Sequence, residues 1–154
     1  MAFKTDHGGM ALRAEIKVAK GASSWRTRLS QLARSNGEIM LCTYSLPRDP
    51  SYLSGLLDKR AEGVTILANA KFRQQAYTLK ARYPALRMLL ATNTHAKMAL
   101  VAPRTVWLSS ENLVKSTNLE NTVGIHSEAV YTFYRDELVR FLHTNDIEAL
   151  EAPL

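Results

Sequence analysis

Apolar residues along the chain follow helical spacing in some segments and form short continuous runs in others. Trp25, Leu29 and Leu32 recur at intervals of four and three residues, which predicts the inward face of a helix. An Asn-Gly pair ends this helix. The apolar run at 38–44 is typical of a buried strand, and a loop with two prolines follows it.

The alternation of helix and strand continues to the middle of the chain. Ser51 opens a second predicted helix, which ends before a strand at 64–68. A third helix at 72–83 stops at a proline and is followed by a strand at 86–90. This order predicts an α/β fold with a mixed, largely parallel β-sheet flanked by helices.

In the second half of the chain, predicted strands follow one another without helices between them. Segments 95–101 and 105–108 are predicted strands joined in a hairpin, and 122–125 is a further strand. Ser127 is placed to cap a final amphipathic helix. We expect the acidic tail after His143 to be frayed.

The length and composition indicate one globular domain. The chain has 154 residues, of which 46% are hydrophobic and 22% are charged. We assign residues 23–143 to a single domain, 1–22 to an N-terminal extension and 144–154 to a C-terminal tail. Because no apolar stretch approaches the ~20 residues of a membrane span and no secretory signal precedes the domain, we expect a cytoplasmic protein without stable membrane association.

Positive charge is concentrated in one part of the sequence. The formal net charge is +6, and the segment 63–110 contains seven Lys and Arg residues without a single Asp or Glu. A solvated helix face would explain part of this pattern. The excess also favours a polyanionic partner, nucleic acid first and anionic lipid second. The candidate nucleic-acid contacts are Lys71, Arg73, Lys80, Arg82 and Arg104.

Candidate chemical groups gather around the predicted hairpin. Because side chains alternate along a strand, His95 and Lys97 share one face. Ser110 and Asn112 come just after the end of the second strand of the hairpin. An imidazole, an ammonium group and small polar groups can therefore converge there.

The spacing of these residues resembles the signature H-x-K-x4-D-x6-G-S-x-N of the phospholipase D superfamily. The segment from Asn118 to Val123 is similar to the N-x-E-N sequence and apolar strand that follow the signature in the family's small dimeric endonucleases. The resemblance covers about residues 38–142, roughly two thirds of the chain. It implies a phospholipase D-like fold.

Two positions depart from the signature. Ala102 stands where the family has Asp, and Ser109 stands where it has the first Gly. The family's aspartate is thought to support the site without contacting the phosphate, and tyrosyl-DNA phosphodiesterases look similar in lacking it. Because Ser restricts the backbone where Gly is free to adopt positive φ, the local turn is expected to differ.

The resemblance implies a role for each matched residue. His95 is the candidate nucleophile, since a neutral imidazole meets little repulsion from an anionic phosphodiester and the family forms a phosphohistidine. Lys97 and Asn112 would stabilise charge on the non-bridging oxygens, and Ser110 would add a hydroxyl donor. Glu120 would accept the other ring N–H of its histidine and fix the orientation of the ring.

The signature supplies one histidine, whereas protonation of the leaving oxygen requires a second. His7, His126 and His143 lie in no second H-x-K sequence. We therefore expect a homodimer that pairs His95 with its copy across a twofold axis. One ring must be neutral while the other is protonated, which predicts a bell-shaped dependence of activity on pH.

The sequence predicts no metal site and no cofactor. It contains no H-E-x-x-H sequence and no carboxylate cluster with metal-site spacing. Cys42 is the single cysteine and lies in an apolar run, so we expect a buried, inert thiol.

These features predict a metal-independent phosphodiesterase that cleaves nucleic acid, with DNA favoured over RNA by the resemblance. Two alternatives stay open. Ala102 and Ser109 also suit a catalytically impaired nucleic-acid-binding module of the same fold. The superfamily also includes phospholipid hydrolases, although the sequence shows no apolar loop suited to membrane insertion.

Overall fold

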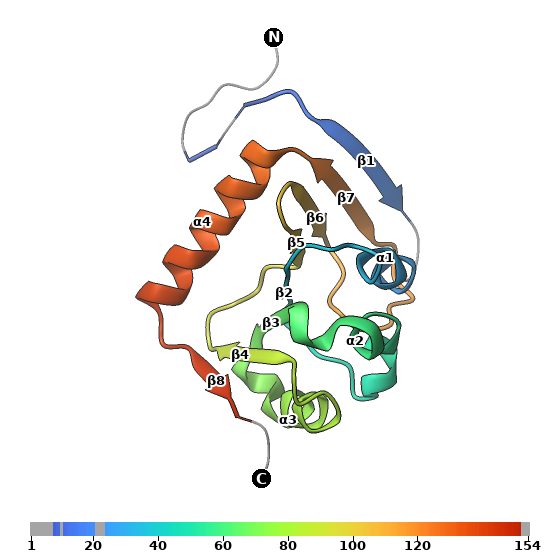
Figure 1. Ribbon diagram of the computed structural model, residues 1–154, viewed down its shortest axis with the longest axis vertical. Coiled ribbons are helices and arrows are strands. Elements are labelled where there is room, and N and C mark those ends of the chain that lie inside the picture. Colours follow the sequence, from blue (N-terminus) through green and yellow to red (C-terminus); the bar gives the residue numbers. More distant parts are fainter. Residues whose placement is uncertain (1–7, 10, 21–23, 152–154) are drawn as a thin grey trace.

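An eight-stranded sheet forms the middle layer of the molecule in the computed structural model, which describes residues 8–9, 11–20 and 24–151 (Figure 1). The strands are β1 Glu15–Lys20, β2 Ile39–Cys42, β3 Val64–Asn69, β4 Arg87–Ala91, β5 Met98–Val101, β6 Thr105–Ser109, β7 Asn121–His126 and β8 Glu148–Leu150. Their order across the sheet is β1-β7-β6-β5-β2-β3-β4-β8.

Helices cover both faces of this sheet (Figure 1). One face carries α1 (Ser24–Leu32), α2 (Ser54–Arg60) and α3 (Arg73–Arg82), and the other carries α4 (Glu128–Thr144). Short 3-10 turns precede or follow these helices, namely η1 (Pro50–Leu53), η2 (Ala61–Gly63) and η3 (Ala70–Phe72). The α/β architecture predicted from the sequence is confirmed.

The central strands are apolar on both sides, because helices pack against both faces. In β4, Met88 and Leu90 belong to the core beneath α1–α3, whereas Leu89 and Ala91 belong to the core beneath α4. This alternation has the period of two that strand geometry imposes. It explains why the sequence shows continuous apolar runs rather than alternating ones.

The sheet is mixed, as predicted, but its parallel part is small. Only the β2–β3 and β3–β4 pairs are parallel, and the other five described pairs are antiparallel. The prediction of a largely parallel sheet is wrong for a physical reason. The meander β5–β6–β7 and the two edge strands all pair antiparallel, and short antiparallel edges give little signal in the sequence.

The two edge strands come from segments that the sequence analysis placed outside the domain. Within the N-terminal segment, β1 pairs with β7 from Glu15↔His126 to Lys20↔Asn121. In the tail, β8 pairs with β4, so the expectation of a frayed tail is wrong. Both segments satisfy backbone groups that the edges of β7 and β4 would otherwise expose.

The N-terminal ends of two helices can be compared with the starting residues predicted from the sequence. The Ser127 hydroxyl accepts a hydrogen bond from the Val130 N–H at 3.4 Å, which confirms Ser127 as the cap of α4. Near the second helix the capping side chain is Asp49, whose carboxylate accepts from the Ser51 N–H at 2.9 Å. The chain there makes η1 before α2, so the helix begins later than predicted.

Cys42 confirms the prediction of an inert thiol. Its side chain is 1% exposed, and burial raises the pKa of the thiol to about 12. A thiol in this environment stays protonated and unreactive at neutral pH.

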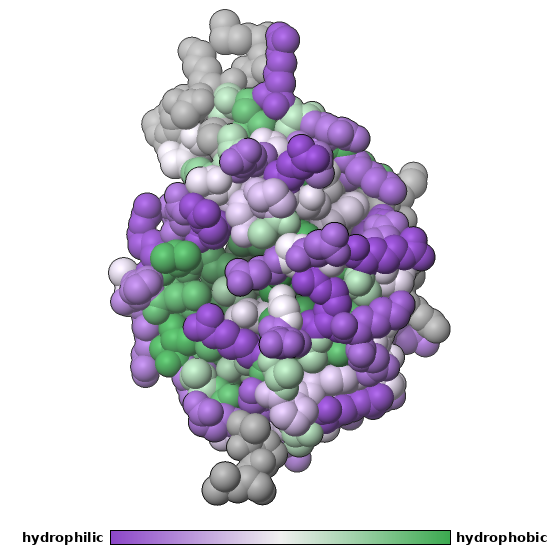
Figure 2. Space-filling model, in the orientation of Figure 1, coloured by the Kyte–Doolittle hydropathy of each residue, from purple (hydrophilic) through white to green (hydrophobic). Residues whose placement is uncertain are grey.

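Apolar surface gathers over the C-terminal end of α4 and the segment that leads to β8 (Figure 2). Val139 is 45% exposed there, and Leu142 and Ile147 are partly buried. Polar side chains predominate over the rest of this view (Figure 2). Among the described residues, no helix combines the length and apolarity needed to span a membrane.

Candidate functional site

The carboxyl ends of β2, β3 and β4 lie at one edge of the sheet, together with the amino end of β5. Because β5 runs antiparallel to β2, its first residue, Met98, pairs with Cys42, the last residue of β2. At the same edge, the Ser109 N–H at the end of β6 donates to the Lys97 carbonyl at 2.9 Å. The loops that carry the candidate residues therefore meet at this edge.

His95 and Lys97 are in direct contact in the extended segment just before β5. The Lys97 ammonium nitrogen lies 3.0 Å from His95 Nδ1 and donates to the His95 carbonyl at 2.9 Å. The His95 ring is exposed, whereas Lys97 is partly buried. Burial lowers the pKa of Lys97, and the negative charge of Glu120 acts in the opposite direction.

Glu120 is held by two serine hydroxyls. Ser110 Oγ donates to Glu120 Oε2, and Ser116 Oγ donates to Oε1 at 2.9 Å. Ser110 Oγ in turn accepts from the Asn121 N–H at 3.0 Å. Because a serine has one hydroxyl proton, Ser110 acts here on Glu120 rather than as a free donor. Within the described part of a single chain no hydrogen bond joins Glu120 to His95, so that predicted contact stays a prediction.

Asn112 is oriented by the loop that follows β2. Its side-chain oxygen accepts from the Tyr44 N–H at 3.1 Å and from the Ser45 N–H at 3.2 Å. These contacts fix which side of the amide carries oxygen, so the two N–H donors point to the other side. The Tyr44 ring lies against the His95 ring, with 5.0 Å between the ring centroids.

A chain of contacts thus connects the predicted catalytic residues at one edge of the sheet. Lys97 contacts the His95 ring and interacts with the charge of Glu120, Ser110 holds Glu120, and Tyr44 joins Asn112 to His95. The set offers an imidazole, an ammonium group and an amide, which are suited to contact an anionic oxygen. The residues brought together are His95, Lys97, Ser110, Asn112 and Glu120.

The sequence analysis missed a clamp on the segment between Ser110 and Asn112. Glu111 is 1% exposed, and its carboxylate accepts from the Trp25 N–H at 3.3 Å. Its backbone carbonyl accepts from the Trp25 indole N–H at 2.7 Å. The start of α1 therefore fixes the segment that presents Ser110 and Asn112. Trp25 and Glu111 are 86 positions apart in the sequence, so no local sequence pattern relates them.

Two more buried polar residues position the loops around His95. The Asn69 amide donates to the carbonyls of Thr92 and Thr94 at 2.9 and 3.1 Å, just before His95. The Thr43 hydroxyl accepts from the Leu113 N–H at 3.0 Å. Asn69 ends β3 and Thr43 directly follows β2. A polar residue at the carboxyl end of a buried strand is the one signal that could have found them.

Comparisons with known proteins show which structures this fold resembles. No family model matches the chain, and no curated protein matches its sequence. Among solved structures it is similar to Nuc, a phospholipase D family member from Salmonella typhimurium, with a TM-score of 0.71, 17% identity, and coverage of 90% of this chain and 100% of Nuc. NucT from Helicobacter pylori has a TM-score of 0.66 and 16% identity, over 85% of this chain and 98% of NucT.

The chain has the phospholipase D-like fold. The same architecture extends to TrmBL2, an archaeal chromatin protein described as showing a novel mode of DNA binding. That similarity has a TM-score of 0.62 and 15% identity, over 85% of this chain and 53% of TrmBL2.

The structure shows where the two residues that depart from the signature, Ala102 and Ser109, lie in this fold. Ala102 lies in the β5–β6 turn, at the opposite end of the hairpin from His95, and its N–H donates to the Glu38 carbonyl at 3.0 Å. Ser109 is the last residue of β6, and its hydroxyl accepts from the Glu111 N–H at 3.0 Å. The backbone at Ser109 is that of a strand.

The five basic residues that the sequence analysis predicted to contact nucleic acid are scattered over the fold. Lys71 is exposed in η3, and Arg73 at the start of α3 forms an ion pair with Glu148. Lys80 is 9% exposed and donates to two backbone carbonyls at 2.8 and 2.7 Å, so its role is structural and its assignment to binding is wrong. Arg104 lies in the β5–β6 turn, away from the candidate site. Arg82 is on the last turn of α3, and its charge acts on Asp49 in the loop after β2.

The other histidines also lie apart from His95. His126 ends β7 at the opposite edge of the sheet and contacts the Thr105 hydroxyl at 3.0 Å. His143 is on the last turn of α4, and His7 falls outside the described residues. Within the described ranges, no group of three or more His, Cys, Asp or Glu residues is placed to hold a metal ion.

Proposed function

We propose that this protein is a phosphodiesterase that cleaves nucleic acid, with DNA preferred, by a covalent phosphohistidine mechanism that uses no metal ion and is completed in a homodimer. The observation that supports it most is the chain of contacts from His95 through Lys97 and Glu120 to Ser110 at one edge of the sheet. The phospholipase D-like fold supports the same conclusion.

The first chemical step uses His95 as the nucleophile. A ring nitrogen of His95 attacks the phosphorus, a nitrogen–phosphorus bond forms, and the bond to the leaving oxygen breaks. The partner's His95 gives its proton to the leaving oxygen. In the second step water attacks the phosphohistidine, the partner's His95 takes a proton from that water, and His95 departs unchanged.

If Nδ1 of His95 is the attacking nitrogen, Lys97 moves away from it during this sequence. An ammonium group can only donate, so the His95 Nδ1 atom that it contacts must be an acceptor without a proton. In this resting arrangement the lone pair of Nδ1 is occupied by Lys97, and the proton of a neutral ring sits on Nε2. We infer that the incoming phosphate draws Lys97 to its non-bridging oxygens, which releases His95 for reaction.

Glu120 and Asn112 complete the proposed site. With its oxygens held by Ser110 and Ser116, Glu120 has a fixed position from which to accept a ring N–H. The Asn112 oxygen is occupied by the loop after β2, so only its N–H donors remain for a phosphate oxygen. We assign Glu120 to orientation of a histidine and Asn112 to binding of the phosphate.

We infer the homodimer from the number of histidines. His126 and His143 are not brought into the described contacts of the candidate site, and a single chain supplies one His95 to it. A twofold axis through the exposed His95 edge would present two copies of the same ring to one phosphate. This arrangement supplies the nucleophile and the acid from one sequence position.

The test is cleavage of a labelled DNA oligonucleotide in excess EDTA. We expect the wild type to cleave it and His95→Ala to lose activity by a factor on the order of 10³ or more. Covalent label transferred to the wild-type chain, stable in alkali and lost in acid, would mark the phosphohistidine.

Matched controls are His126→Ala and His143→Ala, which remove a histidine outside the site and should leave activity close to that of the wild type. Absence of cleavage by the wild type, or undiminished cleavage by His95→Ala, would rule out the proposal. An RNA oligonucleotide of the same sequence tests the preference for DNA.

A binding module without catalysis is the second candidate, and the similarity to the DNA-binding chromatin protein TrmBL2 favours it. It predicts salt-sensitive binding of DNA by the wild type with no turnover and no trapped label. Hydrolysis of phosphatidylcholine vesicles at a rate that matches DNA cleavage would instead indicate a phospholipid hydrolase.

A further inference from the structure

A cleft of about 400 Å³ opens beside the candidate site, and we call it the loop cleft. Its walls come from the loop after β2, from the region where α3 begins, and from the segment after Asn112. Residues that line it include Ser45, Arg48, Phe72, Gln75 and Lys115.

The loop cleft begins where the candidate site ends. Ser45, which lines the cleft, donates its N–H to the side-chain oxygen of Asn112 at 3.2 Å. The Tyr44 ring contacts both the His95 ring at 5.0 Å and the Phe72 ring at 5.4 Å, measured between centroids. The Phe72 ring is therefore at most about 10 Å from the His95 ring, measured between centroids.

The charged groups of the loop cleft leave positive charge in excess. Arg48 and Lys115 are exposed, and neither forms an ion pair within the described part of the chain. Asp49 also lines the cleft, and hydrogen bonds from Ser51 lower the pKa of its carboxylate, which therefore stays negatively charged. Two cations against one carboxylate still leave an excess of positive charge for an anionic ligand.

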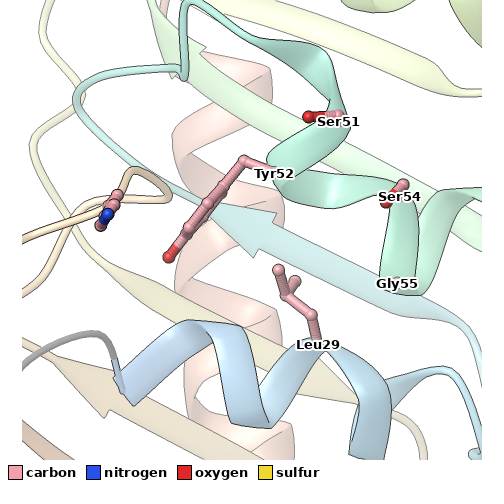
Figure 3. A pocket seen from close by; sticks show the side chains of 6 residues that line it. Leu29, Ser51, Tyr52, Ser54 and Gly55 are labelled. Carbon is pink, nitrogen blue, oxygen red and sulfur yellow. The ribbon is translucent and has the colours of Figure 1, made fainter.

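A second cavity, of about 380 Å³, continues from the loop cleft, and we call it the serine pocket (Figure 3). Figure 3 shows Leu29 of α1 and Tyr52 of η1 projecting into the space between these elements, with the hydroxyls of Ser51 and Ser54 nearby. Because both cavities touch Lys115, they are neighbours, and we call the two together the path.

From this path we propose that the loop cleft and the serine pocket bind the phosphates of the nucleic-acid strand next to the scissile bond. Arg48 and Lys115 each contact a phosphate, and Ser54 donates a hydroxyl hydrogen bond to the strand beyond them. This inference rests on the proposed nuclease function and adds to it a subsite for the flanking strand.

Regularly spaced phosphates need cations along a path, and the path described here supplies them close to His95. Of the cations predicted from the sequence, Lys71 in η3 lies next to Phe72 at the cleft, whereas Lys80 is buried and Arg104 lies in the β5–β6 turn. Arg48 and Lys115 lie outside the acid-free segment 63–110, so net charge along the sequence does not reveal them.

The experiment compares two substrates on the double variant Arg48→Ala/Lys115→Ala. The first is a labelled DNA oligonucleotide that fills the path, and the second is bis-para-nitrophenyl phosphate, a diester too short to reach it. We expect KM for the oligonucleotide to rise about tenfold or more, with kcat/KM for the short diester within about twofold of the wild type.

Binding of the oligonucleotide is measured in parallel by fluorescence anisotropy on the His95→Ala background. Two lost phosphate contacts should make the slope of log affinity against log salt shallower by about 1.4 to 1.8. The control Lys59→Ala/Arg87→Ala removes two exposed cations outside both cavities and lowers the net charge equally. It should leave KM and the slope unchanged.

An unchanged KM and slope in the Arg48/Lys115 variant, or equal changes in the control, would overturn the subsite. This outcome differs from failure of the proposed function, in which the wild type cleaves neither substrate. Because the salt slope does not require turnover, it tests the subsite even then. Melting temperatures of both double variants check that the fold is intact.

Discussion

Lys97 is the residue whose charge matters most to the proposed chemistry, and two opposing influences act on it. Burial disfavours the ammonium form and lowers the pKa of Lys97, whereas the carboxylate of Glu120 favours that form. Loss of the Glu120 charge leaves burial unopposed. The pKa of Lys97 should then fall further.

We predict that Glu120→Gln shifts the deprotonation of Lys97 to lower pH. The variant removes the charge while keeping a side chain of similar shape for Ser110 and Ser116. An NMR titration of ¹³C-labelled lysine measures the shift directly. Any alkaline loss of activity should move in the same direction, because the protonated amine is the form that binds phosphate.

The control for this prediction is Ser116→Ala. It removes one hydrogen bond to Glu120 but keeps the carboxylate charge, so the midpoint of the Lys97 titration should stay near that of the wild type. A midpoint that is the same in wild type and Glu120→Gln would contradict the assigned electrostatic contact.

Residues that share a short sequence pattern could be predicted, and residues joined only by the fold could not. His95 and Lys97 precede the β5–β6 hairpin, and Ser110 and Asn112 follow it, so the pairing of the two strands brings them together. The clamp by Glu111 depends on a helix from the other end of the domain. Lys80 was misassigned because its side chain folds back onto backbone carbonyls, which composition does not reveal.

At the scale of elements, the meander β6–β7 depends on one position without a side chain. Gly124 pairs with Trp107 across these strands, and a Cβ at Gly124 would lie 2.5 Å from the indole ring. The guanidinium of Arg28 lies over the same ring, 4.7 Å from its centroid, and limits where the ring can move. The indole therefore occupies the space that another residue at 124 would need.

We predict that Gly124→Ala lowers the free energy of unfolding by about 1–3 kcal/mol, the range for overpacking a well-filled site. Urea denaturation measures the change. Gly55→Ala is the matched control, because a Cβ there has open space and Ala favours the helix α2. The prediction fails if both variants are as stable as the wild type.

The internal elements could be predicted from the sequence, whereas the two edge strands could not. Central strands such as β3 and β4 carry continuous apolar runs, because helices bury both of their faces. In β1, by contrast, Ile16 and Val18 are 59% and 71% exposed, so no burial pattern marks the strand. Its position follows from pairing with β7, which links residues far apart in sequence.

At the scale of the whole molecule, the account depends on a second copy of the chain. The sequence supplies one H-x-K signature, and the structure of one chain places one His95 at an exposed edge. The proposed reaction needs a nucleophile and an acid at the same phosphate. Two equivalent edges that face each other would provide both.

The heterodimer of wild-type and His95→Ala chains tests this claim most directly. The two chains carry different affinity tags, are produced together and are purified over both tags, and DNA cleavage is measured per dimer in EDTA. If one phosphate needs both copies of His95, the heterodimer should be nearly as inactive as the doubly substituted dimer. Activity of about one half of the wild type would show that each chain acts alone and would contradict the shared site.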